Sequence, residues 1–189
     1  MPKNRQEIPK AERQAELVAQ ARELFVGNGY RGTSVAAVGR AAGIAPAAVH
    51  WYFPTKDDLF AAVIASIFEA ERARVEADAT LSGDPRAELV ALLVRMEPYR
   101  ALHRVAYERM EETATLRAVY EQMRDWLEQR LFAAMSERAG GGADLASVAD
   151  LAHVLFEGLL VSVRRLDRPT DELIDLLIAT LVAAAAKAG

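Results

Sequence analysis

The chain has 189 residues, 52% of them hydrophobic, and carries a net charge of −4. That length is enough for one domain, or for a small domain that shares its core with a larger one. The absence of cysteine excludes disulfide bonds and thiolate metal sites, and it fits a reducing cytoplasm.

Charge and hydrophobicity vary along the chain. Residues 1–56 carry eight Lys or Arg and four Glu, a net +4, so the remaining residues carry −8. A basic N-terminal part on an acidic body is expected for a protein with a local phosphate-binding surface. Uneven scatter of surface charge would give the same numbers. The first eleven residues lack the apolar core of a signal peptide, and the longest apolar run is too short to span a bilayer. We therefore expect a soluble, cytoplasmic protein with no membrane partner.

The first predicted helix covers residues 11–28. Leu17, Ala21, Leu24 and Phe25 recur on one face at helical spacing. An Asn-Gly pair ends the pattern, because glycine commonly terminates helices. We expect this helix to cover two shorter helices that follow it.

Those two short helices are joined by a turn. Thr33 and Ser34 are N-cap residue types, so the first of the two can begin there. The turn falls at residues 41–44, where Gly43 can adopt a positive φ. Pro46 suits the first position of the second helix because it has no N–H to leave unpaired. A second helix whose free face can enter a major groove is an arrangement used for DNA binding.

An ordered set of residues runs through this region, within positions 11–63: Leu24-Phe25, Gly29-Tyr30, Gly32-Thr33-Ser34-Val35, Val38, Ala41-Ala42-Gly43-Ile44, Val49, Tyr52-Phe53, Thr55-Lys56 and Leu59-Phe60. At these spacings the set resembles the TetR family of bacterial transcriptional regulators. Members of that family are all-helical homodimers with a three-helix DNA-binding head and a larger helical body that binds a ligand and dimerises. The resemblance implies an all-α fold here, with a head at residues 1–55 and a body at residues 56–189.

Two positions depart from the family pattern. Ala45 stands where the family usually has a Ser cap, and His50 stands where it usually has a Tyr. These departures concern which DNA sequence is read, rather than the DNA-binding role itself.

The head is therefore expected to contact double-stranded operator DNA. A cation in the first turn of a helix is disfavoured by the helix dipole, so Lys56 is best explained by an external phosphate. The other predicted phosphate contacts are Tyr52, Thr33 and Ser34. Arg40 is a predicted groove or phosphate contact, and the predicted base contacts are Ala47, Ala48, His50 and Trp51. The alternatives are that Lys56 is merely solvated, that Thr33 and Ser34 only cap a helix, and that Trp51 packs against the head.

The rest of the chain is also predicted to be helical. A capping-box spacing, Thr55-x-x-Asp58, begins a long helix over residues 55–78 that would link head to body. Asp84 and Pro85 mark the next helix start. Further helices are predicted at residues 85–96, 99–110, 115–138, 145–166 and 170–187, with a Gly-rich loop at residues 140–142.

A stripe of aromatic residues and methionines is the candidate effector site. Such side chains, with a few polar tips, suit a small and largely apolar ligand. The candidate ligand-binding residues are Met96, Tyr99, His103, Tyr107, Met110, Met123, Trp126 and Phe156. The same stripe is also typical of plain hydrophobic core, so the expectation of a pocket comes from the resemblance.

The last two predicted helices are apolar on more than one face. A helix of that kind must be buried on both sides, and we expect the second side to be covered by another subunit in a homodimer. The predicted interface residues are Leu155, Leu159, Val163, Leu173, Leu177 and Leu181. The alternative is that both faces lie inside the core of one monomer.

No catalytic, cofactor or metal site is predicted. His50, His103 and His153 lie far apart in the sequence, and neither a nucleophile elbow nor a dinucleotide fingerprint is present. We expect a transcriptional regulator, most often a repressor in this family, that a small apolar effector releases from a palindromic operator. The alternative is an all-α ligand-binding or enzymatic body whose head serves only oligomerisation.

Overall fold

The computed structural model describes residues 9–140, 144–162 and 167–188, and all regular secondary structure in these ranges is helical. The α-helices are α1 (Lys10–Gly32), α2 (Val35–Ala41), α3 (Pro46–Tyr52), α4 (Lys56–Glu76), α5 (Pro85–Met96), α6 (Arg100–Arg109), α7 (Ala114–Ala139), α8 (Ala149–Val161) and α9 (Thr170–Ala188). Two short 3-10 turns, η1 (Glu97–Tyr99) and η2 (Leu145–Val148), precede α6 and α8. The predicted all-α fold is confirmed.

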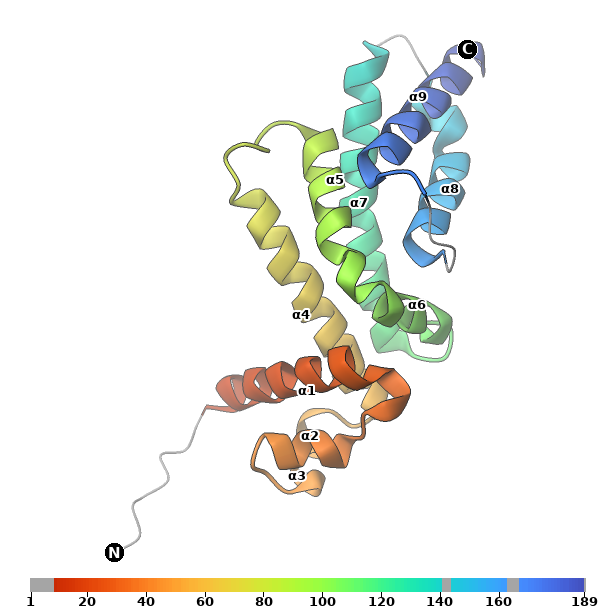
Figure 1. Cartoon of the computed structure of the whole chain (residues 1–189). Coiled ribbons are helices and arrows are strands. Elements are labelled where there is room, and N and C mark those ends of the chain that lie inside the picture. The colour runs from red at the N-terminus through yellow and green to blue at the C-terminus, as the bar shows by residue number, and fades with distance from the viewer. Residues whose placement is uncertain (1–8, 141–143, 163–166, 189) are drawn as a thin grey trace, which may run out of the picture.

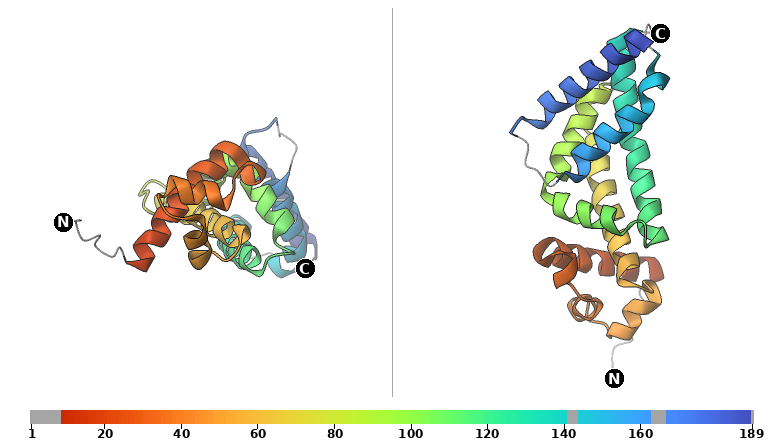
Figure 2. Two further views of the ribbon diagram at one scale, coloured as in Figure 1. Left: turned by 90° about the horizontal axis from the view of Figure 1, so that it is seen from below. Right: turned by 90° about the vertical axis from the view of Figure 1, so that its right-hand side faces the viewer.

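The helices form a small head and a larger body (Figure 1). Helices α1, α2 and α3 make the head, and α2 and α3 lie at its lower end. Helix α4 starts in the head and continues upward beside α5 and α7, while α8 and α9 lie at the upper end of the body. The side view in Figure 2 shows the same two parts joined through α4. Helix α4 is therefore shared by head and body.

Several helices begin at the residues where short-range sequence signals predicted a helix start. The Ser34 side chain accepts a hydrogen bond from the Ala37 N–H at the start of α2. The capping box at the start of α4 is formed, with both of its reciprocal hydrogen bonds. Asp84 caps α5, with Pro85 in its first turn. Gly43 adopts a φ of +67° in the turn between α2 and α3. These predicted boundaries are confirmed.

Two predicted boundaries differ from the structure. The first helix is broken at the Asn-Gly pair as predicted, because Gly29 is not helical, with φ +70° and ψ 174°, but one more helical turn follows and α1 ends at Gly32. Residues 145–166 are not one helix, because η2 comes first and α8 then ends at Val161, where Ser162 adopts a ψ of 129°. Both differences depend on backbone angles at single residues, which hydrophobic periodicity does not report.

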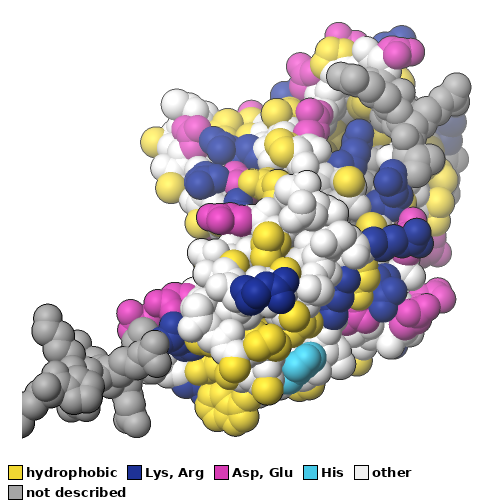
Figure 3. Space-filling view, turned by 60° about the horizontal axis from the view of Figure 1, so that its bottom comes forward, with side chains coloured by type: hydrophobic (Ala, Val, Ile, Leu, Met, Phe, Trp, Pro, Cys, Tyr) yellow, Lys and Arg dark blue, Asp and Glu magenta, His cyan; other side chains and the backbone are white. Residues whose placement is uncertain are grey.

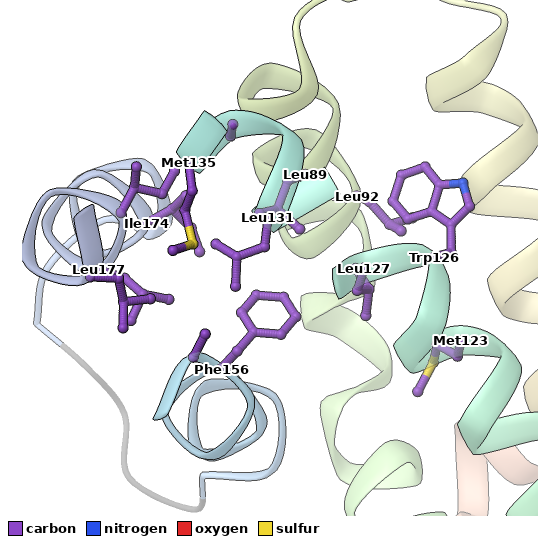
Figure 4. Close-up of a cluster of buried hydrophobic side chains, with 14 of the residues drawn as sticks. Leu89, Leu92, Met123, Trp126, Leu127, Leu131, Met135, Phe156, Ile174 and Leu177 are labelled. Atoms are coloured by element: carbon purple, nitrogen blue, oxygen red, sulfur yellow. The ribbon is translucent and has the colours of Figure 1, made fainter. Parts of the chain in front are cut away.

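The hydrophobic core consists of two clusters that meet along α4. The head cluster contains Phe25, Val38 and Val49, and it extends along the first half of α4 and into α6 and α7. The body cluster surrounds α7, where Leu131 lies among residues of α8 and α9 (Figure 4). Phe68, in the second half of α4, belongs to the body cluster. A tilt of α4 would therefore move the head relative to the body.

Candidate nucleic-acid interface and ligand pocket

Helices α2 and α3 pack closely at Gly39. A β-carbon at this position would lie 3.1 Å from the Ile44 carbonyl oxygen and 3.1 Å from the Val49 Cγ2 atom. Glycine inside a helix costs about 1 kcal/mol relative to alanine, and here the close approach of the second helix explains it. Val49 is fully buried at this contact. The opposite face of α3 is therefore held outward.

That outward face carries most of the residues predicted to meet DNA bases. Ala47, His50 and Trp51 are exposed, and Ala48 is half-buried. The His50 Nδ1 atom lies 3.1 Å from the Pro54 carbonyl oxygen, which orients its ring. Figure 3, with the lower end of the molecule turned forward, shows hydrophobic side chains and a histidine together at the tip of the head.

Trp51 is the most exposed large hydrophobic side chain in the described chain, at 64%. Its ring makes an edge contact with Tyr52, with ring centroids 4.8 Å apart. The Lys10 ammonium lies 4.4 Å from the centre of the Trp51 ring. Trp51 thus does not pack into the head, and Lys10, which the sequence analysis missed, brings a positive charge from the start of α1 to the end of α3.

The two hydroxyls at the start of α2 have different roles. Thr33 is buried, and its Oγ1 atom donates toward the carbonyl oxygens of Leu24, at 3.0 Å, and Gly29, at 2.9 Å. It closes the kinked end of α1 and, contrary to expectation, does not present its hydroxyl to solvent. Ser34 is exposed, as is Arg40 in the last turn of α2.

Lys56 lies in a cluster at the base of α4. Its ammonium is 4.1 Å from the centre of the Tyr30 ring, and burial lowers the pKa of Lys56. The neighbouring Asp57 accepts two hydrogen bonds from Arg109 of α6, at 2.8 and 2.6 Å, one from Thr113, and one from the Tyr30 hydroxyl. The Arg109 hydrogen bonds lower the pKa of Asp57 to about 2. The end of α6 is thereby tied to the start of α4.

A pocket lies in the body, between α6 and the helices α4, α5, α7, α8 and α9. Its lining is Phe68, Leu93, Met96, Glu97, Arg100, His103, Tyr120, Met123, Leu127, Leu159, Leu160, Val161, Thr170, Leu173 and Ile174. Three of the predicted ligand-binding residues, Met96, His103 and Met123, are among them. Burial of the His103 ring lowers its pKa to about 4, so this side chain is neutral near neutral pH.

The other predicted ligand-binding residues lie outside this lining. Tyr99 belongs to η1, so it is out of register with α6, and its hydroxyl accepts a hydrogen bond from Arg22 of α1 at 2.8 Å. Phe156 points toward Leu131 in the body core, and Trp126 lies on the far side of α7 (Figure 4). Tyr107 and Met110 pack against the core clusters.

Arg100 is a pocket residue that the sequence analysis missed. It lies three residues before His103 on α6, so the helical spacing used for the aromatic stripe could also have placed it on this face.

Residues 17–63 match the family model of bacterial regulatory proteins of the tetR family. The match covers most of the head and the start of α4, so the head is a helix–turn–helix DNA-binding domain of the tetR type. No curated protein matches the sequence.

Solved structures share the fold of this chain over nearly its whole length. A tetR-family transcriptional regulator from Streptomyces coelicolor is 20% identical, with 96% of this chain and 85% of that one covered and a TM-score of 0.62. A transcriptional regulator from Rhodococcus sp. Rha1 is 21% identical, with 92% and 97% covered and a TM-score of 0.61. The fatty acid degradation regulator FadR from Bacillus halodurans is 17% identical, with 93% and 97% covered and a TM-score of 0.60.

The predicted dimer residues do not share one surface. Leu177 and Leu181 are buried within the protomer, Leu159 and Leu173 line the pocket, and Val163 lies outside the described residues. Leu155 is exposed. Leu151 and Val154 of α8 and Leu176 of α9 are also exposed, and these three are not among the predicted interface residues.

Neither a metal site nor a membrane-spanning helix is found in the described ranges. There, no group of three or more His, Asp or Glu side chains is arranged to hold a metal ion. No helix in the same ranges is long and apolar enough to cross a membrane.

Proposed function

We propose that the chain is a homodimeric repressor that leaves a near-palindromic operator when a small, largely apolar effector enters the body pocket. The head at residues 1–55 would bind DNA, and the body at residues 56–189 would dimerise and bind the effector. The observation that carries this proposal is that α6 lines the pocket at one end and holds the base of α4 through Arg109 at the other.

DNA binding would use the outward face of α3. In a two-fold dimer, two such helices enter successive major grooves roughly 34–36 Å apart. Ser34, Arg40, Tyr52 and Lys56 would contact phosphates, and Ala47, His50 and Trp51 would contact base edges. Ala47 can offer only apolar contact, such as with a thymine methyl, so His50 and Trp51 would carry most of the direct readout.

Dimerisation would use α8 and α9. Leu151, Val154 and Leu155 recur on α8 at i, i+3 and i+4, and all three are exposed. Gly158 continues this face at i+7, and its missing side chain would permit close approach of a second helix. An apolar stripe of this kind is expected to be buried against another surface.

Effector control requires two states of the body. A ligand shifts their equilibrium only if it binds one state more tightly. In our proposal the ligand moves α6 against α4, and Asp57 transmits this movement to the head. Two recognition helices would then no longer match the groove spacing.

The test is selection of bound duplexes from a random-sequence library, followed by fluorescence anisotropy at several salt concentrations. We expect an enriched near-palindrome whose affinity falls with salt, with a slope reduced by about 0.9 for each Lys56–phosphate contact removed in Lys56→Gln. Lys187→Gln, in the exposed last turn of α9, is the matched control and should keep the slope. A folded dimer that binds no duplex would contradict the proposal and favour a head that serves only oligomerisation.

A further inference from the structure

His103, a residue of the pocket lining, has a buried polar atom without a partner. The side chain lies on α6, is 7% exposed, and its Nε2 atom has no hydrogen-bond partner within the described part of the chain. A buried polar atom without a partner is costly, and native proteins rarely keep one without a use for it. The His103 side chain is part of the pocket lining, so a molecule bound there could supply the missing partner.

Arg100 is a cation on the same wall of the pocket. Its one hydrogen bond among the described residues is to the Leu159 carbonyl oxygen, at 3.2 Å, and no described carboxylate lies within ion-pair distance of it. The nearby Glu97 also lines the pocket, but it is exposed and accepts a hydrogen bond from Thr170. A guanidinium without a counter-ion at an apolar site favours an anionic partner.

These two side chains can act together. They are three residues apart on one helix, so their β-carbons lie roughly 5–6 Å apart on the same face. A guanidinium and a neutral imidazole N–H provide donors for the two oxygens of a single carboxylate. The other side chains of the lining are mostly apolar, and Met96, Met123, Leu127 and Leu159 are among them.

We propose that the pocket binds an amphipathic monocarboxylate, whose carboxylate lies between Arg100 and His103 Nε2 and whose hydrocarbon part packs on the apolar lining. This inference rests on the proposed function, in which the same pocket holds the effector. It adds the charge of the ligand and the two residues that recognise that charge. The hydrocarbon part can be aliphatic or aromatic, and the test below distinguishes them.

The first experiment measures ligand binding without DNA. Isothermal titration calorimetry of the full chain would compare octanoate, 1-octanol and octylamine, which differ only in the head group, and 4-phenylbutyrate, which keeps the carboxylate on an aromatic body. We expect at least one carboxylate to bind about tenfold or more tighter than both 1-octanol and octylamine. Equal affinity for the three octyl compounds, a preference for octylamine, or no binding of any compound would overturn the inference.

The second experiment assigns the binding to these residues. Arg100→Gln and His103→Leu should each weaken carboxylate binding about tenfold while leaving 1-octanol binding unchanged. Arg104→Gln is the matched control, because Arg104 lies on the same helix but not in the pocket lining. If Arg100→Gln weakens carboxylate and alcohol alike, or Arg104→Gln has the same effect as Arg100→Gln, the assignment is wrong.

These outcomes are separable from those of the proposed function. Calorimetry reports on the pocket alone, and fluorescence anisotropy reports on the operator. Carboxylate binding that leaves operator affinity unchanged would support this inference and contradict effector release. Operator binding with no carboxylate preference would overturn this inference and leave the DNA-binding role intact.

Discussion

Arg109 and Asp57 join the end of α6 to the start of α4 by two hydrogen bonds of 2.8 and 2.6 Å. Asp57 follows closely after the recognition helix α3, and α6 begins in the pocket lining. The Tyr30 hydroxyl donates to the same carboxylate from the end of α1. Three elements of the head and body therefore meet at one carboxylate, which makes Asp57 the most direct place to test their coupling.

Replacing Asp57 with Asn should lower the free energy of unfolding of the protein. It should also remove part of the decrease in that free energy at acid pH. The pKa of Asp57 is lowered from 3.8 to about 2, so its contribution is present above about pH 4 and is lost as the pH falls toward 2. A shift of this size corresponds to about 2 kcal/mol. Urea unfolding of Asp57→Asn at neutral and acid pH would measure it. Asp125→Asn, at an exposed position, is the control, and an unchanged acid profile in Asp57→Asn would contradict the assignment.

His103 should make the protein less stable as the pH falls from about 6.5 to about 4. Burial lowers its pKa from 6.5 to about 4, so in this range the unfolded chain binds a proton that the folded chain does not. The free energy of unfolding falls by about 3 kcal/mol by about pH 4. His103→Leu should flatten this part of the profile, as measured by urea unfolding across the range. His50→Gln, at an exposed position, should keep the wild-type profile; if His103→Leu keeps it too, the ring is not buried and neutral.

Gly39→Ala should destabilise the head although alanine favours helix. The added methyl would meet the Ile44 carbonyl oxygen and the Val49 side chain, each at 3.1 Å from the new β-carbon. We expect a loss of about 1–3 kcal/mol in denaturant unfolding, together with weaker DNA binding. Gly27→Ala is the matched control: it is also helical, nothing lies within 4 Å of its β-carbon, and it should stabilise by about 0.5–1 kcal/mol. Equal effects of both substitutions would contradict the close packing of α2 on α3.

Val154→Arg should convert the proposed dimer to a folded monomer. Val154 is 62% exposed on the apolar face of α8, and a desolvated, unpaired guanidinium is costly at an interface. Sedimentation equilibrium would measure the association, with circular dichroism to confirm folding. Val94→Arg is the control, since Val94 is 48% exposed on α5, which is not part of the proposed α8–α9 interface. A dimer that survives Val154→Arg and dissociates in Val94→Arg would place the interface on α5 instead.

Local signals allowed the helix boundaries, the turn and the exposed face of α3 to be predicted from the sequence. Ser34 caps a helix through an amide three residues away, and the Thr55–Asp58 pair acts over the same distance. Gly43 takes the positive φ that its turn requires. Such interactions depend on neighbours along the chain, so residue types and spacing are sufficient to locate them.

Contacts between distant segments were decided only by the tertiary structure. Asp57 and Arg109 are 52 residues apart, and no spacing rule connects them. Thr33 turns inward because the kink at Gly29 brings two carbonyl oxygens of α1 to its hydroxyl. Leu181 is buried within the protomer while Val154 is exposed, although both lie on strongly apolar helices. Which apolar face is covered depends on how the helices pack against one another, and that packing is a property of the whole chain rather than of any one segment.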